Sequence, residues 1–150
     1  MGQVRDISAV LLQRYNVQRG HVIGVLGPAT PDTLAALLAV MSIGAVYVPL
    51  DPVNSRTPDL HLTLVTGTHE QLSNAISLIG DTPQLTLPVT GDIVIPMARD
   101  MSQTREDDNA YIMWTSGTTS SAPTRVTVPH ACVLPNLVCL SVIDQQPLTA

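Results

Sequence analysis

Two short apolar runs with a helical segment between them limit the fold more than any other feature of this sequence. Residues 21–27 form a nearly continuous apolar run, which is typical of a strand covered on both faces. A Thr-Pro-Asp helix start and an alanine- and leucine-rich run follow over residues 30–43, and Gly44 ends that helix. Residues 45–48 predict a second buried strand, which Pro49 is expected to stop. A strand, a helix and a strand in this order predict a parallel crossover unit.

The remaining segments add strands and helices to that unit. We expect Pro135 to interrupt the last helix of the chain. The predicted elements form an α/β fold, in which a largely parallel or mixed sheet is flanked by helices. The patterns predict further strands at 60–66, 110–114 and 125–128, helices at 4–15, 69–79 and 130–140, and short β-rich pieces between prolines over 81–96.

The composition predicts one domain, or part of one, over residues 1–150. The chain is 45% hydrophobic and only 13% charged, which resembles the interior-rich part of a larger protein. A net charge of -5, with no basic cluster, argues against DNA or RNA as a partner. Cys132 and Cys139 fit neither a zinc site nor a secreted disulfide framework, so we interpret them as reduced core thiols on a helix.

Nothing in the first residues predicts export, because the N-terminal segment lacks the apolar run of a secretory signal. A cytoplasmic location is therefore the expectation. Residues 34–50 are apolar, but the stretch is about three residues short of a comfortable membrane span and contains Ser42, Gly44 and Pro49. A buried helix followed by a buried strand explains it better, so no membrane contact is expected.

Residues 110–119 combine a short strand with a loop rich in hydroxyl groups. An apolar run from Ala110 to Trp114 is followed directly by Thr-Ser-Gly-Thr-Thr. Hydroxyl groups and backbone amides at a glycine-containing turn can donate several hydrogen bonds to the oxygens of a nucleotide triphosphate. An ordinary polar loop is the alternative, because Ser, Thr and Gly are also the usual loop residues. We interpret the acidic residues 100–108 as an exposed connector, although acids beside a phosphate site could instead help to hold Mg²⁺.

Two segments of the sequence carry a family resemblance. Residues 41–52 form a predicted helix-to-strand element ending in Tyr-Val-Pro-Leu-Asp-Pro, and residues 110–119 form the strand and hydroxyl-rich loop described above. The first resembles the corresponding element, and the second the phosphate-loop motif, of the adenylate-forming superfamily, which includes acyl-CoA synthetases, luciferases and the adenylation domains of peptide synthetases. Residues 128–136 resemble more narrowly the β-alanine-activating branch of the acyl-CoA synthetases. The resemblance implies that the chain is a partial N-terminal domain of such an enzyme.

The resemblance also implies a reaction and its cofactors. Such enzymes use ATP and Mg²⁺ to join a small carboxylic acid, such as an amino acid, to AMP. The acyl group then passes to a thiol of CoA or of a carrier domain's phosphopantetheine. Hydroxyls and amides of the loop can stabilise the charge that builds on the leaving pyrophosphate. By the resemblance, the β- and γ-phosphates would be contacted by Thr115, Ser116, Gly117, Thr118 and Thr119.

The loop departs from the family pattern after Thr119. The family continues with Gly, any residue, Pro and Lys, whereas this chain has Ser120, one inserted residue before Pro123, and Thr124 at the lysine position. A serine takes a left-handed backbone conformation only at a penalty of about 1 kcal/mol or more. Thr124 is uncharged, so the positive charge of the lysine would have to come from Arg125. The predicted nucleotide-binding set therefore includes Ser120, Thr124 and Arg125 with altered chemistry.

The family's remaining motifs and its C-terminal lid would follow residue 150. We therefore expect a fragment, a short isoform or an imperfect gene model, with weak or absent catalysis by the chain alone. The alternative is a catalytically inactive remnant that acts by binding another protein. The high apolar content favours that alternative, because an uncovered sheet leaves adhesive surface.

Overall fold

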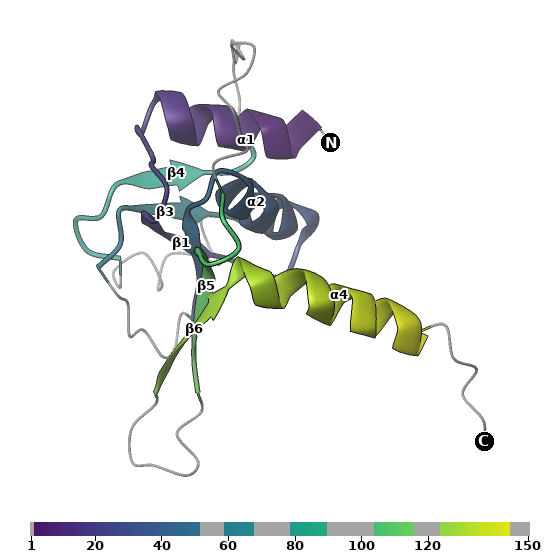
Figure 1. Ribbon diagram of the computed structural model, residues 1–150. Coiled ribbons are helices and arrows are strands. Elements are labelled where there is room, and N and C mark those ends of the chain that lie inside the picture. Colours follow the sequence, from purple (N-terminus) through teal and green to yellow (C-terminus); the bar gives the residue numbers. More distant parts are fainter. Residues whose placement is uncertain (1, 52–58, 68–78, 90–103, 116–123, 145–150) are drawn as a thin grey trace.

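The computed structural model describes residues 2–51, 59–67, 79–89, 104–115 and 124–144. Figure 1 shows α1 and α2 beside the strands and α4 extending away from them. The α/β fold expected from the sequence is confirmed. In chain order the elements are α1 (Gly2–Gln13), β1 (Val22–Leu26), α2 (Pro31–Ser42), β2 (Val46–Leu50), β3 (Leu62–Val65), β4 (Gln84–Thr86), β5 (Asn109–Trp114), β6 (Arg125–Pro129) and α4 (His130–Asp144).

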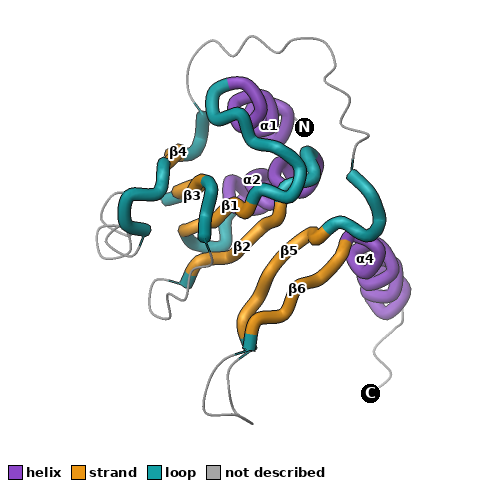
Figure 2. Tube along the Cα trace, turned by 60° about the vertical axis from the view of Figure 1, so that its left-hand side comes forward, coloured by secondary structure: helices purple, strands orange, loops and turns teal. Residues whose placement is uncertain are grey.

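The described strands form one six-stranded sheet in the order β4-β3-β1-β2-β5-β6. β1 pairs in parallel with β2 and β3, β3 pairs in parallel with β4, and β2 pairs in parallel with β5. β6 runs antiparallel to β5, and the two strands lie side by side as a hairpin in Figure 2. The sheet is therefore mixed and largely parallel, and β1, α2 and β2 form the predicted crossover unit.

α2 begins and ends where its sequence signals predict. The Thr30 side chain accepts a hydrogen bond from the Thr33 N–H at 3.4 Å, which satisfies one of the unpaired donors at the helix start. Pro31 and Asp32 lie in the first turn, where a fixed φ and a negative charge are both favourable. Gly44 follows the helix with a φ of +73°, a left-handed conformation that glycine adopts without steric strain.

One face of the sheet packs against α1 and α2. Side chains of both helices meet alternate residues of the strands, so that Leu62 and Leu64, two apart on β3, point into the same cluster. Burial of each large apolar side chain stabilises the fold by roughly 1.5–3 kcal/mol. The buried cluster contains Ile7, Leu11, Val17, Ile23, Val25, Ala35, Ala36, Ala39, Val40, Ala45, Leu62, Leu64, Leu85 and Leu87.

The opposite face of the sheet holds two smaller buried clusters. Val46, Val48 and Ile112 form one of them across β2 and β5. Gly24 of β1 leaves room on this face for the Leu50 side chain, because a Cβ on Gly24 would lie 2.7 Å from it. Leu26, Val65 and Ile79 form the other cluster.

β2 continues through Pro49, so the prediction that Pro49 stops the strand is wrong. β2 pairs with β1 along its whole length, from Val46 to Leu50. On its other side, the pairing with β5 is recorded at Tyr47 and Tyr111. No ladder bond toward β5 is therefore required at Pro49, and its missing N–H is tolerated.

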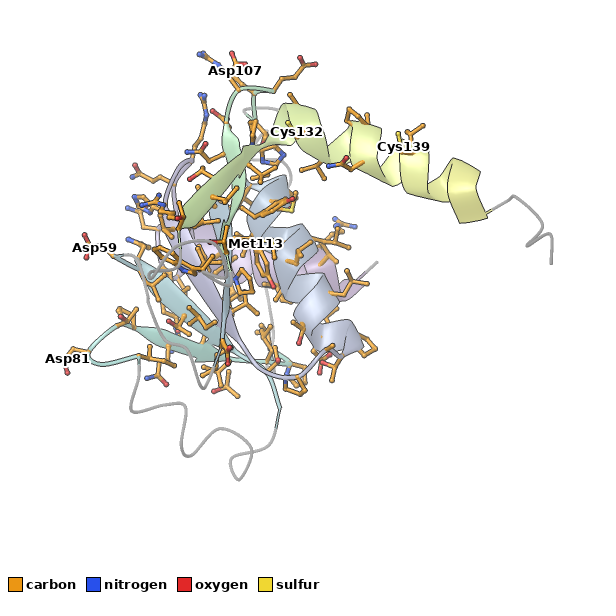
Figure 3. The ribbon with its side chains drawn as sticks, turned by 90° about the horizontal axis from the view of Figure 1, so that it is seen from below. Asp59, Asp81, Asp107, Met113, Cys132 and Cys139 are labelled. Carbon is orange, nitrogen blue, oxygen red and sulfur yellow. The ribbon has the colours of Figure 1, made fainter. Side chains whose placement is uncertain are left out.

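α4 is a helix of 15 residues with Pro135 inside it, so the predicted interruption is also wrong. Pro135 lies in the second turn, where it removes the bond to the Ala131 carbonyl but keeps a φ compatible with a helix. Figure 3 shows α4 projecting from the other elements with Cys132 and Cys139 along it. Both cysteines are free and exposed. The helix was predicted correctly, but these cysteines are not core residues, because α4 extends away from the sheet.

Several predictions have shifted bounds or fall on undescribed residues. The strand expected at 60–66 is β3, and one β-rich piece expected within 81–96 is β4. The predicted helix at 69–79 lies outside the described residues except for Ile79, which is buried. Among the helices that the structure describes, none combines the length and apolarity needed to cross a membrane.

Candidate functional site

The predicted phosphate loop starts at the edge where the parallel strands end. β1 to β5 all run in one direction, so Leu26, Leu50, Val65 and Trp114 finish at the same edge of the sheet. Thr115 follows β5 directly. Ligands of open parallel sheets bind outside the carboxyl ends of the strands. The loop therefore begins at the edge of the fold where a ligand is expected.

Two hydrogen bonds close the base of this loop. The Thr115 N–H donates to the Thr124 carbonyl at 2.9 Å, and the Thr124 N–H donates to Thr115 Oγ1 at 2.9 Å. The Thr115 hydroxyl thus accepts through its oxygen and keeps its own proton for another acceptor. Thr115, Thr124 and Arg125 are all exposed. The other predicted loop residues, Ser116, Gly117, Thr118, Thr119 and Ser120, lie outside the described residues.

Arg125 and Trp114 face each other across the hairpin next to the loop base. Arg125 is the first residue of β6, the strand that follows the loop, and its side chain is exposed. Trp114 is half-buried, and its Nε1 atom is buried with no hydrogen-bond partner in the described part of the chain. A buried N–H without a partner costs about 1–3 kcal/mol.

A cluster of threonine hydroxyls at the same edge was not predicted from the sequence. Thr33 Oγ1 donates to the Pro28 carbonyl at 2.5 Å and lies 2.8 Å from Thr66 Oγ1. Gly27 makes this approach possible, because a Cβ on Gly27 would lie 2.0 Å from Thr66 Oγ1. The helix-start signal at Thr30 was the sequence evidence nearby, but it did not reveal the contact with β3. The cluster ties the start of α2 to the ends of β1 and β3.

The acidic connector lies at the opposite edge of the sheet. Asp108 immediately precedes β5, whereas the loop follows β5 at Thr115, about 23 Å away along the strand. The Arg19 guanidinium donates two hydrogen bonds of 2.5 Å to the Asp108 carboxylate. The described part of the predicted connector, residues 104–108, therefore lies at the far end of β5 from Thr115, and residues 100–103 lie outside the described residues. Among the described residues, no group of three or more His, Cys, Asp or Glu could hold a metal ion.

The charges around Asp108 have a direct electrostatic consequence. Hydrogen bonds from the Arg19 side chain and from the Arg105 N–H lower the pKa of the Asp108 carboxyl to about 2. His130, the first residue of α4, donates its backbone N–H to the Asp108 carbonyl at 2.8 Å. Burial lowers the pKa of the His130 imidazole, and Asp108 partly opposes that shift. His130 therefore lies beside the ion pair at the far end of β5 from the loop.

A mostly parallel sheet whose strand ends lead into a hydroxyl-rich sequence is typical of ligand-binding α/β domains. Residues 2–146 match the family model described as AMP-binding enzyme. The chain belongs to this family of adenylate-forming enzymes.

The curated relatives are synthetases much longer than this chain, and the chain matches a small part of each. The chain is 31% identical over 146 residues to the PKS-NRPS hybrid synthetase ATPKS of Aspergillus niger, covering 85% of this chain and 8% of that protein. It is 29% identical over 128 residues to bacitracin synthase 2 of Bacillus licheniformis, covering 82% of this chain and 5% of that protein. The chain thus spans less than a tenth of the length of these curated relatives.

Solved structures share the fold. A complex of VinN with L-aspartate matches 94% of this chain and 42% of its own, with a TM-score of 0.67 and 19% identity. A four-domain nonribosomal peptide synthetase bound to AMP and glycine matches 96% of this chain and 10% of its own, with a TM-score of 0.65 and 24% identity. At these identities the likeness concerns the fold.

Proposed function

We propose that the chain is the phosphate-contacting part of an adenylating domain, which activates a carboxylic acid with ATP and Mg²⁺. The observation that carries this proposal is the hairpin of β5 and β6. Its loop base, closed by the two bonds between Thr115 and Thr124, lies at the carboxyl edge of the parallel strands. Family membership supports the same reaction class. Donors at that edge can stabilise charge on the leaving pyrophosphate.

The proposal extends to particular residues and substrates. The Thr115 hydroxyl accepts through its oxygen and can donate its proton to a phosphate oxygen. Thr124 occupies the position of the family's lysine, and the exposed Arg125 beside it would supply the positive charge instead. The set is completed by Ser116, Gly117, Thr118, Thr119 and Ser120. The acid is a small one, with β-alanine as the first candidate, and CoA or a carrier phosphopantetheine accepts the acyl group. The reaction would take place in the cytoplasm, where ATP and free thiols are supplied.

A second candidate function is protein binding without catalysis. Large apolar side chains are exposed on α4 and on the hairpin, including Leu134, which is 68% exposed, and Met113, which is 49% exposed. Figure 3 shows Met113 at the sheet and α4 projecting away from it. Exposed apolar surface of this kind favours contact with another protein.

Thermal unfolding with nucleotide separates the two candidates. If the loop binds MgATP, a concentration about 100-fold above Kd stabilises the chain by about 2.7 kcal/mol, which raises Tm by roughly 5–10 °C. Thr118→Ala should reduce the rise, whereas Thr127→Ala, an exposed threonine of β6, should leave it unchanged. A wild-type Tm that MgATP does not move would contradict the proposal and favour the non-catalytic candidate. Pyrophosphate exchange with β-alanine then tests the substrate.

A further inference from the structure

The hairpin of β5 and β6 is joined to the rest of the sheet by a short ladder. β1 and β2 share five registered residue pairs, whereas β2 and β5 share the single pair Tyr47 and Tyr111. Apolar contact between Val48 and Ile112 supports this junction. A junction centred on one pair resists separation better than it resists rotation. A second attachment at a distance would help to fix the angle of the hairpin.

The Arg19–Asp108 ion pair supplies such an attachment at the amino end of β5. Arg19 donates from Nε and Nη2 to the two carboxylate oxygens, each at 2.5 Å, in the bidentate geometry that favours one orientation. The side chain of Asp108 is only 16% exposed and that of Arg19 is 37% exposed. The two residues are 89 positions apart in the chain.

Both partners are themselves held by the backbone around them. On the Arg19 side, the Gly20 N–H donates to the Gly44 carbonyl at 2.8 Å, which ties this loop to the end of α2. On the Asp108 side, the carboxylate also accepts the Arg105 N–H at 2.8 Å, and the Asp108 carbonyl accepts the first N–H of α4. The ion pair therefore connects the α1 and α2 layer to the hairpin and to α4 together.

We propose that Arg19 and Asp108 are positioning residues, which set the angle of the β5–β6 hairpin and through it the position of the loop base at Thr115 and Thr124. Asp108 and Thr115 lie on opposite sides of Tyr111 along the strand, at about 10 Å and about 13 Å from it, so a rotation about Tyr111 moves both of them. A displacement of about 1 Å at the ion pair moves the loop base by a similar distance in the opposite direction. The effect on nucleotide binding rests on the function proposed above, whereas the effect on the hairpin does not.

Trp114, the only tryptophan of the sequence, reports the hairpin position without any nucleotide. It lies at the loop end of β5 and is half-buried, so acrylamide quenching of its fluorescence measures how closely the hairpin packs. We expect the quenching constant to rise about twofold in Arg19→Gln and Asp108→Asn, well below Tm and with unchanged circular dichroism. Arg19→Lys, which keeps the charge but loses the bidentate geometry, should be intermediate. Arg5→Gln, an exposed arginine of α1, is the matched control.

The outcomes decide the proposal in either direction. Salt of about 1 M should increase quenching in the wild type and not in Arg19→Gln, because it screens this partly exposed pair. MgATP affinity should fall about tenfold in Arg19→Gln and less in Arg19→Lys. Wild-type quenching in a folded Arg19→Gln protein overturns the positioning role, even if Tm is lower. A wild type that does not bind MgATP contradicts the proposed function, while the quenching series still decides the positioning role. If Asp108→Asn does not fold, the two Arg19 variants carry the test.

Discussion

Gly27→Ala should be one of the most destabilising single-methyl additions in the chain. A Cβ on Gly27 would lie 2.0 Å from Thr66 Oγ1 and 2.3 Å from the Thr66 carbonyl oxygen. The hydroxyl could turn aside, but the carbonyl belongs to the backbone that follows β3, and an ordinary contact would require a shift of about 1 Å. Gly27 also has a φ of +151°, which an L-residue adopts only with strain.

Two separate penalties add to the expected magnitude. Overpacking of a site that cannot relax costs about 1–3 kcal/mol, and a positive φ costs a further 1–2 kcal/mol or so. Gly27→Ala should therefore lower the free energy of unfolding by about 2–5 kcal/mol. Because domains of this kind are stable by about 5–15 kcal/mol, the variant should fold with a much lower urea midpoint.

Gly20→Ala is the matched control for this prediction. Gly20 has a φ of +82°, but a Cβ there would find nothing within 4 Å, so only the backbone penalty of about 1 kcal/mol applies. Urea unfolding of the two variants, followed by circular dichroism, separates the steric penalty from the backbone penalty. Equal losses in Gly20→Ala and Gly27→Ala would refute the close approach of β1 to Thr66, on which the geometry of this edge depends.

Three further predictions concern the core, the pH dependence and α4. Leu64→Ala, which empties a fully buried site, should cost about 2–5 kcal/mol in urea unfolding, whereas Leu134→Ala on the exposed side of α4 should change stability by about 0.5 kcal/mol or less. Burial, and to a smaller extent the neighbouring His61, lowers the pKa of His21 below its unfolded value near 6.5. The unfolded state therefore binds more protons, and the free energy of unfolding should fall as the pH drops through about 6.5. His21→Gln should reduce this pH dependence between roughly pH 7 and 5, and an unchanged pH dependence would exclude His21 as the cause. Pro135→Ala should restore a helical N–H and raise the free energy of unfolding by about 1–3 kcal/mol, and a lower Tm would show that α4 depends on the proline.

Local patterns were sufficient to predict most of the elements. The apolar runs that became β1 and β5, and the Thr-Pro-Asp start of α2, carry their signal within a few consecutive residues. Two proline predictions failed for a physical reason that lies outside the local pattern. Pro49 is tolerated because β2 needs no bond toward β5 at that position, and Pro135 because α4 continues on either side of one missing bond.

The candidate site divides in the same way. The strand before the loop was predicted from a contiguous motif and is β5, whereas the hydrogen bonds between Thr115 and Thr124 at the loop base were not predicted. The contact between Thr33 and Thr66 could not be predicted, because it joins the start of a helix to the end of a strand 33 residues away. The nucleotide contacts of Thr115, Thr124 and Arg125, and those of residues 116–120, remain predictions.

The sequence by itself determined the strands, the crossover unit and the resemblance to adenylate-forming enzymes, because backbone preferences and motifs act over short distances along the chain. Only the tertiary structure decided which distant side chains meet. It paired Arg19 with Asp108 across 89 positions, and it left Cys132 and Cys139 exposed although their helix is apolar. Such contacts depend on how strands are ordered in the sheet and on what covers each face, and a linear pattern contains neither.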